Sequence, residues 1–116
     1  MFDDEFHVEA SMSGYGALLL RVVGELDAAT SDELIAALSE WLGITELTVD
    51  LSECTLIDSR GLKAVLECRH QIGEAAEMRL VGVPSNIEHT LRLAGLETVL
   101  GLDRDNDPLD APTATI

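Results

Sequence analysis

Residues 46–62 read ELTVDLSECTLIDSRGL, and this stretch decides the fold because it leads from a strand pattern into a helix. Apolar and polar residues alternate from Glu46 to Leu51, which predicts a buried strand. After a polar turn, helical spacing predicts a helix from Arg60 to Ile72. Ser59 precedes this helix, beside its unpaired N–H groups and the positive end of its dipole. Such a serine is either a helix cap or a functional site.

On the N-terminal side of this stretch, the pattern predicts a β-hairpin and one helix. Strands are expected from His7 to Met12 and from Ala17 to Val23, with a glycine-containing turn between them. Thr30 and Glu33 have the spacing of a capping box, so a helix is expected to begin there. The expected apolar face of that helix and the glycine that ends it are Leu34, Leu38, Trp41, Leu42 and Gly43.

On the C-terminal side, three further elements are expected. They are a strand from Met78 to Val81, a helix capped by Ser85 and Glu88 that buries Ile87, Leu91 and Ala94, and a short strand from Thr98 to Leu100. Residues 103–116 are acidic and interrupted by prolines, which predicts a disordered tail after a domain spanning residues 1–102.

This order of elements predicts a single α/β domain with a mixed, mostly parallel β-sheet and helices packed against it. In open sheets of this kind, functional sites gather at the carboxyl ends of the strands. Asp27 and the pair Asp58-Ser59 both follow predicted strands, so we expect them at the same edge of the sheet.

Composition excludes several classes of partner. The chain carries a formal net charge of −15 and only seven Lys and Arg residues, which disfavours nucleic acid and anionic membranes. Cys54 and Cys68 lack the spacing of a disulfide framework or a zinc site, so reduced thiols are expected. The sequence contains no run long enough to span a membrane and has an acidic start, which favours a cytoplasmic protein.

The candidates for catalysis are weak, and we expect neither an enzyme nor a cofactor or metal. The three histidines lie in different predicted elements, and Ser59 is not in a Gly-x-Ser-x-Gly elbow, which disfavours a hydrolase. Asp50 resembles the phospho-acceptor of a receiver domain, but the acidic pair and lysine that would hold Mg²⁺ and phosphate are absent. Asp50 is interpreted as a strand-end residue or a local cap.

Two motifs nevertheless carry a family resemblance. GELDAATSDELIAAL at residues 24–38 and TVDLSECTLI followed by DSRG at residues 48–61 resemble the STAS domain, in particular the stand-alone bacterial anti-sigma factor antagonists. The resemblance runs from about Val8 to about Leu102. It implies a domain that binds an anti-sigma factor with serine kinase activity and thereby releases a sigma factor.

The resemblance also implies roles for individual residues. Ser59 matches the serine that the kinase phosphorylates to switch the antagonist off, and a phosphatase resets it. The residues matched to the partner-binding surface are Asp27, Asp58, Arg60, Gly61 and Leu62.

Three alternatives stay open at this point. Ser59, or Asp58 before it, simply caps the helix. The domain is a constitutive subunit of a larger assembly, such as a lipid-transport complex, without phospho-regulation. The weakest alternative is a domain that binds a small ligand or nucleotide.

Overall fold

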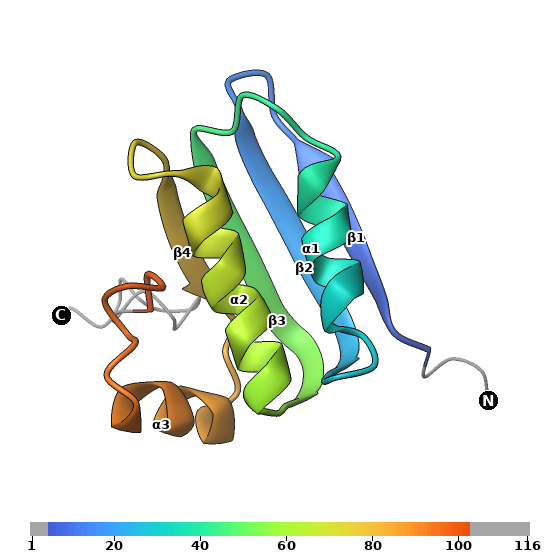
Figure 1. Cartoon of the computed structure of the whole chain (residues 1–116), viewed down its shortest axis with the longest axis vertical. Coiled ribbons are helices and arrows are strands. Elements are labelled where there is room, and N and C mark those ends of the chain that lie inside the picture. The colour runs from blue at the N-terminus through green and yellow to red at the C-terminus, as the bar shows by residue number, and fades with distance from the viewer. Residues whose placement is uncertain (1–4, 103–116) are drawn as a thin grey trace, which may run out of the picture.

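The computed structural model describes residues 5–102. Its elements are β1 (His7–Met12), β2 (Ala17–Leu26), α1 (Ser31–Ser39), β3 (Glu46–Ile57), α2 (Ser59–Ile72), β4 (Glu77–Val81) and α3 (Ser85–Leu93). Figure 1 shows α1 and α2 side by side over one face of the sheet, and α3 near the end at which α2 begins. The tail expected from residue 103 lies outside the described residues.

The four strands form one mixed sheet in the order β1-β2-β3-β4. The hairpin strands β1 and β2 are antiparallel, whereas β2, β3 and β4 are mutually parallel. Leu20, Val49 and Leu80 are aligned across the three parallel strands. The predicted α/β domain with a mixed, mostly parallel sheet is therefore confirmed.

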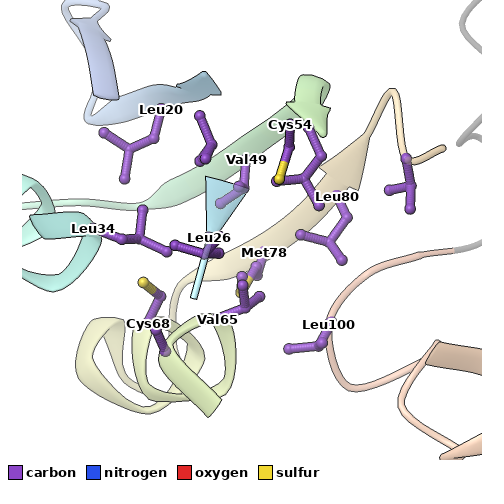
Figure 2. Packing of buried hydrophobic residues seen from close by; sticks show 14 of the residues in the cluster. Leu20, Leu26, Leu34, Val49, Cys54, Val65, Cys68, Met78, Leu80 and Leu100 are labelled. Atoms are coloured by element: carbon purple, nitrogen blue, oxygen red, sulfur yellow. The ribbon is translucent and has the colours of Figure 1, made fainter. Parts of the chain in front are cut away.

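The core lies between the sheet and the helices that cover it. Alternate strand residues point to this side, and Leu20 and Val49 are fully buried there. Leu34 from α1 and Cys68 from α2 point toward the sheet from the side of the helices, as Figure 2 shows. Aliphatic side chains make up most of the core, which follows from a sequence with few aromatic residues.

β3 is longer than its alternation predicts, because two irregularities interrupt its pairing with β2. The register shifts between Arg21 and Val23 and again between Gly24 and Glu25 of β2. Each shift gives β3 one residue more than its partner, as in a β-bulge. After Leu51, the side chains that point inward are therefore every third residue instead of every second. The strand continues to Ile57, so the expected strand end at Leu51 was wrong.

The end of α1 and the start of α3 differ from the sequence-based expectations. α1 ends at Ser39 and does not reach Gly43, which leaves Leu42 90% exposed instead of on the apolar face. α3 begins after Pro84 and makes no side-chain cap bond, so the capping box expected at Ser85 is not formed. Ala94 follows the end of α3 and is exposed.

No strand forms at Thr98 to Leu100. The backbone there bonds locally, since Leu100 N–H donates to Leu96 O (3.0 Å) and Leu102 N–H donates to Glu97 O (2.7 Å). Leu100 is nevertheless fully buried, which explains the strand-like apolar signal. This segment is a series of turns that adds a hydrophobic side chain to the core.

Asp50 lies in the middle of β3, so its interpretation as a strand-end residue was wrong. Its Oδ2 lies 3.5 Å from Arg21 Nε on the face of the sheet opposite the core, and its Oδ1 accepts a bond from Ser52 N–H (2.9 Å). Arg21 Nη1 also lies 3.9 Å from Glu9 Oε1. These ion pairs are half-exposed and cross neighbouring strands, which is a structural role.

Both cysteines are free and buried. Burial raises the pKa of the Cys68 thiol to about 12, with a smaller contribution from Glu67, and burial also raises the pKa of Cys54. Since the thiolate is the reactive form, both side chains act as packing residues. No helix among residues 5–102 is long and apolar enough to cross a membrane.

We predict that Cys68 resists a thiol-specific disulfide reagent in the native protein at pH 8. The variant Cys54→Ala isolates its reaction, and denaturation in urea should expose the thiol and restore the rate of a free cysteine. Rapid labelling without urea would contradict the described burial.

Candidate functional site

The candidate site lies where β2 and β3 end beside each other. Leu26 and Ile57, the last residues of these parallel strands, are paired in the sheet. Asp27 and Asp58 follow them directly, and Asp58 N–H donates to Leu26 O (3.2 Å). The structure therefore brings together the two acidic positions that were expected at one edge of the sheet.

Asp58, and not Ser59, caps α2. Asp58 Oδ1 accepts a hydrogen bond from Gly61 N–H (2.9 Å), and the residue has the extended backbone of an N-cap. Ser59 is the first residue of the helix and is exposed. Its hydroxyl makes no hydrogen bond with any residue between 5 and 102. The capping role is thus assigned to Asp58, which leaves the Ser59 hydroxyl accessible at the positive end of a helix dipole.

Gly61 lets α2 approach the end of β2. A Cβ at this position would lie 2.8 Å from the Leu26 carbonyl carbon and closer still to its oxygen. Gly61 is buried, so it offers no exposed surface to a partner. Because Gly61 has no side chain, the start of α2 packs directly against the end of β2. This contact fixes the position of Ser59.

Asp27 belongs to a loop that is fixed by Thr30. The Thr30 hydroxyl donates to Glu25 O (2.7 Å) and accepts from Asp27 N–H (2.9 Å). Asp27 Oδ1 in turn accepts from Ala29 N–H (3.0 Å). Thr30 makes no side-chain bond to α1, so the capping box predicted with Glu33 was wrong. The hydroxyl holds the loop before the helix instead.

The start of α2 has two different sides. Ser59 and Leu62 line a groove of about 130 Å³ between α2 and α3. Arg60 lines a separate groove between α2 and α1, together with Asp32 and Lys63. Consecutive helix residues do not face each other, so Arg60 is directed away from the groove beside Ser59.

The α3 side of the groove was missed by sequence reasoning. Asn86, Ile87, Thr90 and Leu91 line it opposite Ser59. The apolar spacing of Ile87 and Leu91 predicted burial in the core, and both are buried. Only the position of α3 beside the start of α2 shows that the exposed Asn86 and Thr90 border the same site (Figure 1).

The remaining polar candidates do not assemble. The three histidines lie on β1, α2 and α3, and residues 5–102 hold no group of three His, Cys, Asp or Glu side chains placed to bind a metal. A wider hollow of about 560 Å³ adjoins the Asp27 loop and is bordered by the carboxylates of Glu25, Asp27 and Glu53. The lining of this hollow is therefore acidic.

Comparison with known proteins agrees with this fold. The model of one family, the STAS domain, matches residues 13–107. Since this covers most of the chain, the protein belongs to the STAS domain family.

Solved structures of both regulatory and transport proteins are similar to this chain. An anti-sigma factor antagonist from Mycobacterium paratuberculosis is 20% identical, with a TM-score of 0.70 over 84% of this chain and 85% of that chain. The Bacillus cell fate determinant SpoIIAA in its phosphorylated form is 20% identical, with a TM-score of 0.65 over 79% and 86%. A sulfate transporter family protein from Wolinella succinogenes is 16% identical, with a TM-score of 0.66 over 83% and 79%. At these identities the likeness shows the fold.

We predict that Gly61→Ala lowers the free energy of unfolding by about 1–3 kcal/mol or more, because the new methyl group meets the Leu26 backbone. Gly14→Ala is the matched control, since nothing lies within 4 Å of a Cβ there. Urea unfolding measures both variants. Equal stability of the two would contradict the close approach.

We also predict that Asp58→Ala destabilises the protein by about 1 kcal/mol through loss of the α2 cap. Asp58→Asn retains an acceptor for Gly61 N–H and should restore most of that stability. Thermal or urea unfolding of the two variants separates the cap bond from the negative charge; an Asn variant as unstable as the Ala variant would refute the assignment.

Proposed function

We propose that this protein is a non-enzymatic anti-sigma factor antagonist. It binds an anti-sigma factor that is also a serine kinase, and this binding releases a sigma factor. Family membership and the likeness to anti-sigma factor antagonists support the class of function. The observation that carries the proposal is Ser59, an exposed serine with an unused hydroxyl at the start of α2.

Phosphorylation of Ser59 is the proposed off-switch, and a phosphatase resets it. The modification adds about −1.5 to −2 charges at a helix N-terminus, where the dipole favours them by about 0.3–1 kcal/mol. Asp58 keeps its bond to Gly61, so the fold is expected to persist. The switch then acts on the surface and not on the stability of the domain.

The charge acts on the partner. Two like unit charges about 6 Å apart, at an effective dielectric constant near 20, repel by roughly 3 kcal/mol. That energy corresponds to a loss of about a hundredfold in affinity. Arg60 is on the other side of α2, so it is poorly placed to neutralise the phosphate. A carboxylate or nucleotide phosphate on the partner is sufficient to give this repulsion.

The proposed partner surface surrounds Ser59. It contains Asp27, Asp58, Arg60 and Leu62, with Gly61 contributing through the position it gives the helix. The groove beside α3 extends this surface to Asn86 and Thr90. Such a partner acts in transcription, so the protein is expected in the cytoplasm.

A second candidate is a constitutive STAS subunit of a membrane transport assembly, such as a lipid-transport complex. The likeness to the Wolinella succinogenes transporter family protein favours it specifically. In that role the Ser59 surface contacts a transporter component, and phosphorylation does not regulate the contact.

Purified protein, unphosphorylated and phosphorylated at Ser59, distinguishes these two functions in quantitative pull-downs from the source cells. We predict that phosphorylation, or Ser59→Asp, lowers recovery of an ATPase-fold anti-sigma factor by ten- to a hundredfold. Mass spectrometry of the native protein should locate phosphate on Ser59.

Ser13→Asp is the matched control, because Ser13 is an exposed serine in the turn between β1 and β2, at the end of the sheet away from the start of α2. It should leave recovery unchanged. Phosphate confined to another residue, or recovery of the same transporter proteins by all variants, would refute the switch and favour the second function.

A further inference from the structure

The end of the sheet opposite Ser59 presents large apolar side chains to solvent. Tyr15, in the turn between β1 and β2, and Leu42, in the loop before β3, are each 90% exposed. Figure 1 shows these two loops at the same end of the sheet, opposite the start of α2. Exposed apolar side chains that lie together, unlike single ones, mark sites of protein interaction.

The two loops are held together, so this surface is preformed. Thr45 Oγ1 donates to Tyr15 O (2.9 Å), and Thr45 N–H donates to Gly16 O (2.9 Å). Binding therefore requires little ordering of the backbone, which lowers the entropic cost of association.

Leu42 borders a groove of about 370 Å³, which lies between the loop before β3 and the end of α2. Trp41 and Ile72, both half-buried, line it, and Gln71 Nε2 donates across it to Ser39 Oγ (3.0 Å). Trp41 is the single tryptophan of the chain. Tryptophan and tyrosine are the residues that most often dominate the binding energy of protein interfaces. We call Tyr15, Trp41, Leu42 and Ile72 the loop-end surface.

Acidic residues adjoin this surface. Glu40 precedes Trp41, Glu74 closely follows Ile72, and both are exposed. The nearby Arg69 guanidinium donates to the carbonyls of Gly73 and Ala76, so its donors are directed into the turn. The loop-end surface thus combines the exposed Leu42 and the half-buried Trp41 with two exposed carboxylates that are close to them in the sequence.

We propose that the loop-end surface docks a basic amphipathic helix of a second protein partner. Apolar residues of such a helix cover Trp41 and Leu42, while its Lys and Arg side chains meet Glu40 and Glu74. A second copy of this chain is a poorer occupant, because each copy brings the same carboxylates and a net charge of −15. Anionic lipid is disfavoured by the same repulsion.

This docking surface goes beyond the proposed switch. β3 spans 12 residues between the two ends of the sheet, which corresponds to about 36 Å at 3.3 Å per residue. A partner on the loop-end surface therefore leaves Ser59 exposed. The protein is able to link two partners, one of which is independent of phosphorylation.

The test uses the fluorescence of Trp41 and an 18-residue amphipathic peptide made of Leu and Lys. We expect saturable binding with a blue shift, weakened by raising the salt concentration, and no saturable binding of a scrambled peptide of the same composition. Leu42→Ser should raise the Kd about tenfold, which is the effect of leaving a leucine side chain uncovered. Glu40→Gln with Glu74→Gln should raise it further.

Leu93→Ser is the matched control, because Leu93 is 76% exposed on α3 at the other end of the molecule. It should leave the Kd unchanged, and circular dichroism should show every variant folded. An absent blue shift, an equal effect of Leu93→Ser, or equal binding of the scrambled peptide would overturn the proposal. Two further results would overturn the proposal: concentration-dependent dimers in ultracentrifugation that Leu42→Ser abolishes, and binding to anionic phosphatidylserine vesicles that Leu42→Ser abolishes.

Discussion

The site depends on the contact between the first turn of α2 and the end of β2. The Leu26 carbonyl accepts the Asp58 N–H, and the same peptide group packs against Gly61, where a Cβ has no room. Both interactions involve backbone, so neither is adjusted by rotating a side chain. The helix is thereby fixed to the sheet at its N-terminus, and Ser59 is presented on a rigid support. The proposed switch, which acts by charge alone, relies on such a rigid support.

Sequence patterns predicted the architecture well because the core is buried on one side of the sheet. Alternation along β2 and β3 reports burial directly, and helical spacing along α2 reports the face that covers it. The position of Asp27 and Asp58 at one sheet edge followed from the parallel order of the strands. Of the alternatives left open by the sequence, the one in which Asp58 caps α2 agrees with the structure.

The errors share a physical origin in tertiary contacts that local patterns do not contain. Thr30 has the sequence of a cap but bonds to the preceding loop, since the Glu25 carbonyl lies within reach in the folded chain. Leu42 fits a helical period but follows the end of α1. Leu100 has a strand-like signal because it fills the core from a turn. The groove beside Ser59 was not predictable either, because Thr90 belongs to a helix that only folding brings beside α2.

The two register shifts between β2 and β3 have a consequence for how this protein tolerates change. Together they give β3 two residues more than β2, and each extra residue reverses which face the following side chains occupy. The number of residues between Leu51 and Asp58 therefore determines the orientation of everything after it, whatever their identity. Deletion of a single residue in this segment would shift the register of β3. It would turn the Asp58 cap and Ser59 away from their present positions. Related chains that keep this geometry must preserve the length of the segment more strictly than its composition.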